Sequence, residues 1–461
     1  MNYDVLIIGG GPAGYTAAIQ AAKHDLKVGL IEKETLGGTC LNRGCIPTKA
    51  LLHVANTYDQ FKQSGNMGIG FRELTLDLDK AYQYKDEIVD KLVNGIDFLI
   101  KANKIDFFHD TASFKDQQTI ELATSKEMLT AKNIIIATGA RPIKLPLLGM
   151  DLSCVYTSDD ILRKPIKEKK IIIIGGGVIG CELATFYHQS GCDVTIIELQ
   201  KRILSTIDRE LAQNLNMTFK RKGINIITDA QVKAITMHDN QAICHYHSND
   251  KDLEISSNAI ILSIGRKPNS DQLALDKLNI NTEKGYIKVN NNYQTNIEHI
   301  YAIGDINGGI QLAHVAAAQA IDCIEYIVNK PRHYLTSTIP YCIYTKPEIA
   351  YLGITEDEAK NKKIDYVTSK FIMSNNGKYL IESNERGFIK VILENDVIIG
   401  AQLFMDKATE FAAYFATAID NKLTYQQLTK IIFAHPTMSE GIKETIENIH
   451  QASVHIAPIN H

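Results

Sequence analysis

Two cysteines, Cys40 and Cys45, have the surroundings in this sequence that most favour covalent chemistry. They lie on either side of Gly44, and Pro47 and Lys49 follow them. Bonded cysteines have Cα atoms roughly 4.4–6.8 Å apart, closer than residues five apart in a regular α-helix. If the two are bonded, the segment between them must therefore be irregular, and Gly44 makes this easier. Pro47 suits the first turn of a helix from Lys49 onward, whose N-terminus would favour the thiolate of Cys45.

The pair could instead be two buried thiols or half of a metal site. A zinc site needs further ligands at a matching spacing, whereas the other cysteines are scattered among apolar neighbours. We therefore expect no metal. Eight cysteines in a chain of this length, without a secretion signal, do not predict a disulfide framework either.

A glycine-rich turn near the N-terminus predicts a dinucleotide site. Gly9, Gly11 and Gly14 follow an apolar run at 3–8 and precede a helix-like segment, and Glu32 closes the next apolar run. Such glycines let the backbone approach a pyrophosphate at the helix N-terminus, and the carboxylate accepts hydrogen bonds from a ribose. The alternative is a plain tight turn, which the strand, helix and acid in register argue against.

The same arrangement returns 166 residues later, with Gly175, Gly177, Gly180 and Glu198. A carboxylate at position 198 would bond a free ribose 2′-hydroxyl and repel a 2′-phosphate, so NAD is favoured over NADP. Two basic residues close behind could instead hold a phosphate, and this alternative stays open: Lys201 and Arg202.

A histidine near the C-terminus, His435, is followed by Glu440 five residues later. Thiol chemistry needs a base that takes a proton and returns it, and the unperturbed pKa of histidine suits that task near neutral pH. An acid on the other ring nitrogen would fix the orientation of the ring. A lone histidine is more often structural, so this pair gains weight only from its context.

The elements that must position these residues read as repeated strand–turn–helix–strand units, which predict an α/β fold with two Rossmann-like, doubly wound domains. From about residue 340 the pattern changes to β-rich segments and amphipathic helices, as in an α+β domain. The formal net charge of −4 gives no reason to expect nucleic acid or an anionic membrane as a partner. We see no cleavable signal and no run long enough to span a bilayer, so we expect a cytoplasmic protein.

Several motifs together resemble the pyridine nucleotide–disulfide oxidoreductase family, and within it the dihydrolipoamide dehydrogenase branch. The likeness covers essentially the whole chain and includes the two glycine turns. The other motifs are Gly-Gly-Thr-Cys-Leu-Asn-x-Gly-Cys-Ile-Pro at 37–47, Ala-Thr-Gly-Ala at 137–140, Gly-Arg-x-Pro-Asn at 265–269, Ile-Tyr-Ala-Ile-Gly-Asp at 300–305, Tyr-Thr-x-Pro-Glu at 344–348 and His-Pro-Thr-x-Ser-Glu at 435–440.

The resemblance implies a division of labour within a redox disulfide. Cys45 would lie beside the flavin of FAD and Cys40 would exchange with the substrate. His435, oriented by Glu440, would act as base on the dithiol of the other subunit of a homodimer. A further implied pair, beside the flavin, is Lys49 with Glu182.

The resemblance also implies which residues bind the two cofactors. For FAD they are Gly9, Gly11, Gly14, Glu32, Lys49, Ala112, Thr138, Gly139, Asp305 and Ala313. For NAD they are Gly175, Gly177, Gly180, Glu198, Val232 and Gly265. The implied domains are 1–145 (FAD, first part), 146–270 (NAD), 271–339 (return to the FAD and central domain) and 340–461 (α+β dimerisation domain).

Three positions depart from the family pattern: Phe433, where histidine is frequent, Thr48, which replaces a common serine, and Arg43, which stands between the cysteines in place of a small apolar residue. Arg43 could shift a thiol pKa or contact an acidic partner, but we expect a solvated side chain.

The implied activity is the oxidation of protein-bound dihydrolipoamide to lipoamide with reduction of NAD. Implied partners are lipoyl domains, or a lipoylated carrier protein, of a 2-oxo acid dehydrogenase or glycine cleavage complex. The alternatives are a glutathione-type reductase, an NADH oxidase or diaphorase, and a flavoprotein that serves mainly as a binding subunit.

Overall fold

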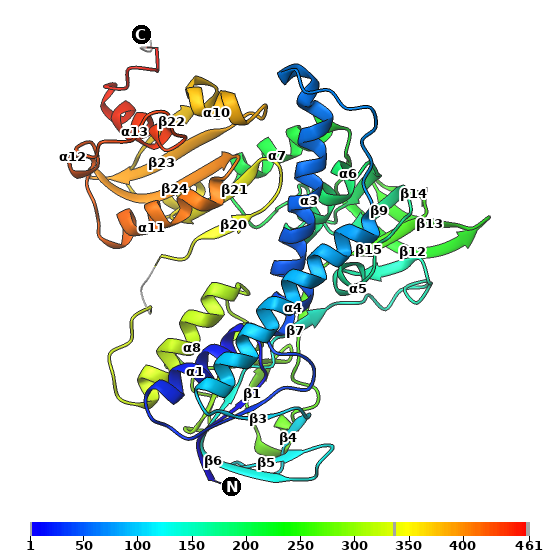
Figure 1. Cartoon of the computed structure of the whole chain (residues 1–461), viewed down its shortest axis with the longest axis vertical. Helices are drawn as coiled ribbons and strands as arrows, with labels where there is room; N and C mark the ends of the chain where they lie inside the picture. Colours follow the sequence, from blue (N-terminus) through cyan, green and yellow to red (C-terminus); the bar gives the residue numbers. More distant parts are fainter. Residues whose placement is uncertain (1, 335–337, 458–461) are drawn as a thin grey trace. The chain divides into compact units, whose positions relative to one another are not determined.

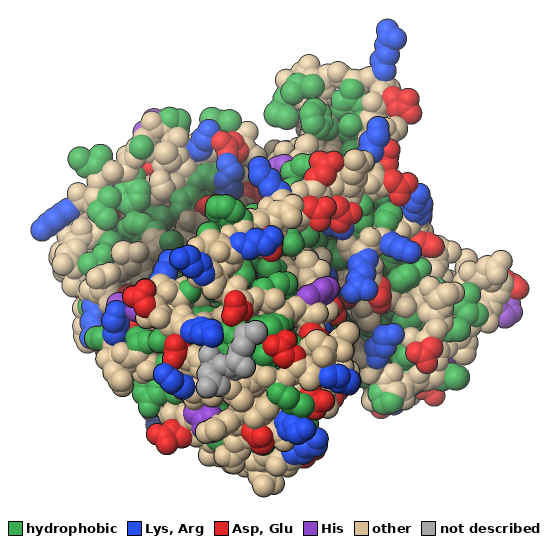
Figure 2. All heavy atoms as spheres, turned by 60° about the horizontal axis from the view of Figure 1, so that its bottom comes forward, with side chains coloured by type: hydrophobic (Ala, Val, Ile, Leu, Met, Phe, Trp, Pro, Cys, Tyr) green, Lys and Arg blue, Asp and Glu red, His purple; other side chains and the backbone are tan. Residues whose placement is uncertain are grey.

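The computed structural model describes residues 2–334 and 338–457, which divide into two compact units (Figure 1). The first unit contains 2–168 and 258–334, and the second contains 169–257 and 338–457. Each unit holds one of the two glycine turns. No helix within these described ranges is long and apolar enough to cross a membrane. On the face drawn in Figure 2, acidic and basic side chains are intermixed, as a small net charge would suggest.

The main sheet of the first unit has the order β3-β2-β1-β6-β5-β4, with β19 also paired to β6. Strands β1, β2, β3, β6 and β19 are parallel, whereas β4 and β5 are antiparallel additions. Their bounds are β1 (Asn2–Ile8), β2 (Val28–Ile31), β3 (Asp106–Phe108), β4 (Ala112–Phe114), β5 (Thr119–Leu122), β6 (Met128–Ile136) and β19 (Ile300–Ala302).

Both faces of this sheet are covered, which explains why β1 is a continuous apolar run. Val5 and Ile7 point into a core that includes α1 (Pro12–Lys23) and α8 (Ala313–Ile327), two helices that pack side by side. Leu6 and Ile8 point into a second core with β4 and β5. The alternation along the strand thus divides one apolar run between two cores.

The remaining elements of the first unit lie outside this sheet. The helices α3 and α4 pack against each other, and β7 pairs antiparallel with β16 while β8 pairs parallel with β15. The bounds are α2 (Gly38–Arg43), α3 (Cys45–Gln63), η1 (Ser64–Met67), α4 (Leu78–Ala102), β7 (Ala140–Pro142), β8 (Val155–Thr157), α5 (Ser158–Arg163), β15 (Ala259–Leu262), β16 (Arg266–Pro268), η2 (Leu275–Leu278), β17 (Thr282–Glu283), β18 (Tyr286–Ile287) and η3 (Gly304–Asn307).

The second unit begins with a repeat of the same βαβ plan. Strands β9, β10 and β11 are parallel, and β12, β13 and β14 form an antiparallel sheet. The bounds are β9 (Lys170–Ile174), α6 (Val178–Gln189), β10 (Asp193–Ile197), α7 (Arg209–Lys222), β11 (Asn225–Ile227), β12 (Ala230–His238), β13 (Gln241–Ser248) and β14 (Lys251–Ser257).

The C-terminal part of the second unit is an antiparallel sheet of order β20-β21-β24-β23-β22, packed with helices around its own core. The bounds are β20 (Tyr341–Ile343), β21 (Glu348–Gly353), α9 (Glu356–Asn361), β22 (Val367–Ile372), η4 (Met373–Asn375), α10 (Gly377–Glu382), β23 (Phe388–Glu394), β24 (Val397–Met405), η5 (Ala408–Phe411), α11 (Ala412–Asp420), α12 (Tyr425–Leu428), α13 (Glu440–Glu447) and η6 (Asn448–His450).

The predicted fold class is confirmed: two strand–turn–helix units of the Rossmann kind are followed by an α+β domain. The division into four segments at 145, 270 and 339 stays a prediction.

Candidate active site

The two glycine turns have nearly the same backbone. Gly9 and Gly175 have φ of 108° and 105°, a region that favours glycine. Gly11 and Gly177 are the N-caps of α1 and α6, with φ of −73° and −74°. Each turn therefore presents the N-terminus of its helix in the same way, as a site for an anion.

A glutamate closes each turn from the next strand. The Oε2 atom of Glu32 accepts a hydrogen bond from the amide of Gly10 at 2.6 Å. Its Oε1 atom accepts a second hydrogen bond, at 2.8 Å, from the amide two residues after Glu32 itself. Glu198 accepts the same two kinds of hydrogen bond, from the amide of Gly176 at 2.6 Å and from the amide two residues after Glu198 at 2.7 Å. Both carboxylates are thus held beside their turns, where a ribose of a dinucleotide would lie.

The glycines of the two turns serve two purposes, close backbone packing and open space at a helix N-terminus. A side chain on Gly9 would begin 2.3 Å from the carbonyl oxygen of Ala137, and one on Gly14 would begin 1.7 Å from the carbonyl oxygen of Gly9. These two glycines are required by close backbone packing. A Cβ on Gly177 would meet no described heavy atom within 4 Å, so here the missing side chain leaves open space at the helix N-terminus. Gly180 is buried within α6.

Cys40 and Cys45 form a disulfide with Cα atoms 4.7 Å apart. The expected irregularity is confirmed and confined to Gly44 (φ −147°, ψ −108°), because α2 ends at Arg43 and α3 begins at Cys45. The expectation that the helix begins at Lys49 was wrong by one turn. Cys45 is itself the first residue of the long helix, which favours its thiolate still more directly.

The prediction that Arg43 is a solvated side chain was wrong. Its side chain is 21% exposed and forms ion pairs with Glu34 and with Asp159, the latter at 3.2 Å from Nε to Oδ2. Sequence reasoning missed this because the partners lie 9 residues before and 116 residues after it.

Two of the predicted FAD residues belong to a polar junction in the first unit. The Thr138 hydroxyl donates to the carbonyl of Asn269 at 2.9 Å, and the Asn269 side-chain amide donates back to the carbonyl of Thr138 at 2.8 Å. Gly139 follows with φ 69°. These hydrogen bonds bring together two motifs that are distant in sequence, Ala-Thr-Gly-Ala and Gly-Arg-x-Pro-Asn.

Asp305 lies in η3, directly after β19. Burial raises the pKa of its carboxyl, and the nearby Arg266 guanidinium opposes this shift. A hydroxyl that donated a hydrogen bond to this carboxylate would stabilise its charged form. Of the other predicted FAD residues, Ala313 begins α8 and Ala112 begins β4.

The remaining predicted NAD residues and the predicted ion pair fall in different units. Val232 is buried in β12 of the second unit, whereas Gly265, with φ 112°, belongs to the first. Lys49 lies in α3 of the first unit. Glu182, only 4% exposed in α6 of the second, accepts a hydrogen bond from the amide of Tyr344 at 3.0 Å.

His435 and Glu440 are brought together as expected. The Nδ1 atom of His435 lies 2.9 Å from Oε1 of Glu440, and Oε2 of Glu440 accepts a hydrogen bond from the amide of Thr437 at 2.9 Å. Burial disfavours the Glu440 carboxylate, but these two hydrogen bonds outweigh it and hold its pKa below the usual range. The His435 side chain is 81% exposed, so its ring faces outward in the single chain.

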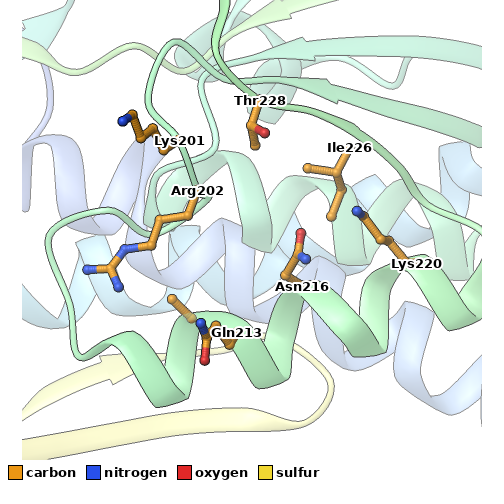
Figure 3. Close-up of a pocket in the computed structure, with 8 residues that line it drawn as sticks. Lys201, Arg202, Gln213, Asn216, Lys220, Ile226 and Thr228 are labelled. Atoms are coloured by element: carbon orange, nitrogen blue, oxygen red, sulfur yellow. The ribbon is translucent and has the colours of Figure 1, made fainter.

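A basic pocket of ≈ 210 Å³ is lined by residues of the loop that follows Glu198 and of α7 (Figure 3). Lys201, Arg202 and Lys220 line it, together with the polar side chains of Gln213 and Asn216. The Arg202 guanidinium already donates to two carbonyls of its own loop, each at 3.0 Å. With Glu198 held at the neighbouring turn, the geometry favours a free ribose hydroxyl over a 2′-phosphate.

Phe433 is half-buried against the C-terminal core, with its ring 6.2 Å from that of Tyr414. This residue, which departs from the family pattern, therefore serves packing.

A disulfide between two consecutive helices, combined with two oriented dinucleotide turns, defines a flavoprotein disulfide oxidoreductase. The chain belongs to the pyridine nucleotide-disulphide oxidoreductase family, whose model matches residues 3–320, with the dimerisation domain of that family at residues 339–446. It is an enzyme, and its cofactors are FAD and NAD.

Similar proteins cover nearly the whole chain. A dihydrolipoyl dehydrogenase of Bacillus subtilis is 39% identical over 96% of this chain and 97% of its own length. One of Geobacillus stearothermophilus is 36% identical over 98% and 97%. Among solved structures, the HOCl-induced flavoprotein disulfide reductase RclA from Escherichia coli matches with a TM-score of 0.87 and 28% identity, over 96% of this chain and 99% of that one.

Proposed function

We propose that this protein oxidises protein-bound dihydrolipoamide to lipoamide, with FAD as resident cofactor and NAD as electron acceptor. The observation that carries the proposal is the Cys40–Cys45 disulfide at the start of α3, in the same chain as two dinucleotide turns. The names of the two relatives described above support the choice of substrate. The Glu198 carboxylate beside Gly176 supports the choice of NAD.

The reaction at sulfur requires two exchanges. A substrate thiol gives its proton to His435 and attacks Cys40 Sγ, so that a mixed disulfide forms and Cys45 leaves as a thiolate. The second substrate thiol then attacks the substrate sulfur of the mixed disulfide, which closes lipoamide, and its proton passes to Cys40, which leaves as a thiol. The substrate loses two electrons and two protons, and the dithiol gains the electrons. When bound, FAD and NAD supply the chemistry that removes them as hydride.

The base is proposed to act across a subunit boundary. The dimerisation domain supports a homodimer, and His435 is 81% exposed in the single chain, with Nδ1 already bound to Glu440. The other ring nitrogen is therefore the one that would meet the dithiol of the partner subunit.

The proposed cofactor contacts are assigned to the two turns and their surroundings. FAD is proposed to contact Gly9, Gly11, Gly14, Glu32, Lys49, Ala112, Thr138, Gly139, Asp305 and Ala313. NAD is proposed to contact Gly175, Gly177, Gly180, Glu198, Val232 and Gly265, and an ion pair of Lys49 with Glu182 is proposed to form beside the flavin.

The proposed partner is a lipoyl domain, or a lipoylated carrier protein, of a 2-oxo acid dehydrogenase or glycine cleavage complex in the cytoplasm.

A cofactor-and-substrate matrix on purified enzyme tests the proposal. We expect turnover of dihydrolipoamide with NAD, and a drop to background in Cys40→Ser. Turnover near wild type in that variant would contradict the role of the dithiol. Preferred turnover of glutathione disulfide with NADPH would favour a glutathione-type reductase, and steady oxygen consumption with NADH would favour an oxidase. Absence of turnover in flavin-loaded dimer that still binds a lipoyl acyltransferase core would favour a binding subunit.

A further inference from the structure

The short helix α2, which carries Cys40, is held at both ends by arginines of the first unit. Near its start, the Thr39 hydroxyl lies 3.4 Å from Nη2 of Arg266. At its end, Arg43 turns back to pair with Glu34 and Asp159. Arg266 is anchored in turn by a hydrogen bond of 2.6 Å to the carbonyl of Ala140.

Both arginines share one carboxylate. Asp159 Oδ2 lies 3.2 Å from Nε of Arg43, and its Oδ1 lies 3.5 Å from Nη1 of Arg266. These three side chains, called the ion triad below, are 16% exposed for Asp159, 21% for Arg43 and 12% for Arg266. Solvent therefore screens their charges only partly. Asp159 is itself fixed in the first turn of α5, whose N-terminus has a capping box of Thr157 and Asp160.

Once its disulfide opens, α2 is held by the buried Leu41 side chain and by a few polar contacts. It has six residues, far fewer than an isolated helix needs in water. Asn42 bonds the carbonyls of Leu36 and Gly38, which belong to the loop before α2 and to α2 itself. Apart from the disulfide, the covalent link to α3 passes through Gly44, the residue type with the greatest backbone freedom.

We propose that Asp159 is a positioning residue for the redox reaction: by joining Arg43 to Arg266, it keeps Cys40 facing Cys45 while the disulfide is open. The proposal rests on the proposed function only in that this disulfide opens and closes during turnover. Reduction adds two electrons and two protons to give two thiols, and it removes the crosslink between α2 and α3. The ion triad then acts together with the buried Leu41 side chain and the Asn42 hydrogen bonds as a remaining restraint on α2.

The test measures the thiol–disulfide equilibrium of the flavin-loaded dimer, without lipoamide or NAD. Protein is equilibrated anaerobically with ratios of reduced and oxidised dithiothreitol, thiols are trapped with an alkylating mass tag, and the 38–45 region is read by mass spectrometry. Asp159→Asn and Arg43→Met loosen the reduced state and lower the effective concentration of one thiol toward the other. We expect reduction to become easier, with an equilibrium constant at least about fivefold larger in both variants.

Hydrogen exchange separates positioning from general stability. In both variants the amides of residues 38–45 should exchange faster than wild type in the reduced protein and close to wild type in the oxidised protein. Arg43→Lys keeps the charge but not the planar donors that span two carboxylates, so its equilibrium constant should fall between wild type and Arg43→Met. Lys167→Met removes the exposed ion pair of Lys167 with Asp79 in the same unit and serves as the matched control.

An equilibrium constant within twofold of wild type in Asp159→Asn and Arg43→Met would overturn the proposal. Equal acceleration of exchange in the oxidised and reduced proteins would also overturn it, because the triad would then be a general structural brace. If Asp159→Asn does not fold, Arg43→Met alone decides. This measurement of the thiol–disulfide equilibrium uses no lipoamide. If the equilibrium is unchanged in the variants while the wild-type enzyme turns over dihydrolipoamide, the positioning role is rejected and the proposed function stands.

Discussion

At the scale of the residue, the pair of His435 and Glu440 makes a specific prediction. His435→Ala should lower dihydrolipoamide turnover by about 10²–10⁴-fold, the usual contribution of a general base, because the variant lacks the group proposed to take the thiol proton. Glu440→Gln should lower it less, since the ring remains but loses its charged partner. Electron transfer from NADH to ferricyanide needs no substrate thiol and should stay near wild type in both variants.

The carboxylate also gives a pH dependence whose sign can be stated. The folded-state pKa of Glu440 lies below its usual value, so the Glu440 carboxylate contributes to folding stability at pH above that usual value, and this contribution is lost as pH falls through the folded pKa.

The control for the loss of turnover in His435→Ala is His238→Ala, which removes an exposed histidine of the same unit. Equal losses in His238→Ala and His435→Ala would argue against a catalytic role for His435.

At the scale of the element, Gly177 at the start of α6 separates folding from binding. A Cβ there meets no described atom within 4 Å, so Gly177→Ala should fold and retain FAD. The added methyl group would stand where the NAD pyrophosphate approaches the helix N-terminus. We expect the KM for NAD to rise at least about tenfold, or about 1.4 kcal/mol. Steady-state kinetics with NAD as the varied substrate measure this.

Gly95→Ala provides the matched control, because Gly95 also has no described atom near its Cβ position but lies in α4 of the other unit. Its KM for NAD should equal that of wild type. An unchanged KM in Gly177→Ala would contradict the assignment of this turn to NAD.

A second prediction for an element concerns the buried lysine that ties α7 and α9 to β23. Lys390, with a 6% exposed side chain, pairs with Glu210 at 2.9 Å and also with Glu356. Lys390→Met leaves two partly buried carboxylates without this partner and should lower the free energy of unfolding by about 3 kcal/mol. Lys360→Met, which removes a largely exposed partner of Glu356, should lower it by no more than about 1 kcal/mol. Urea denaturation measures both.

The hydrogen bond from Lys390 is the main cause that lowers the pKa of Glu356 to about 2. Because the folded-state value lies below the ordinary one of 4.5, the wild-type protein should lose this stabilisation as pH falls from that value toward 2. In Lys390→Met this part of the acid sensitivity should diminish. The same pH dependence in both proteins would show that the lysine does not control Glu356.

At the scale of the whole molecule, a base supplied by the partner subunit predicts complementation. Homodimers of Cys45→Ser and of His435→Ala should both be inactive. After dissociation and random reassociation of an equal mixture, about half of the dimers are mixed, and each has one complete site, so activity should recover to about a quarter of wild type. Activity that stays at background, with mixed dimers present, would place both groups in one chain.

Much of this molecule could be predicted from the sequence because its signals are local. Gly9, Gly14 and Gly175 are demanded by backbone conformation or close approach, and Glu32 and Glu198 lie at fixed distances behind their turns. The break in helical backbone at Gly44 could be predicted from the Cα–Cα distance that a disulfide allows. Local rules such as these depend on neighbours in the chain, so they can be inferred without knowing the fold.

Only the tertiary structure decided the surroundings of the redox pair. The sequence suggested a solvated Arg43 and a helix from Lys49, whereas the structure buries most of Arg43 against Asp159 and starts α3 at Cys45. The partners that hold α2, Asp159 and Arg266, lie 116 and 223 residues beyond Arg43, and no spacing rule connects them. A long charged side chain is solvated or paired according to what the fold places within its reach, and that is a property of packing rather than of local sequence.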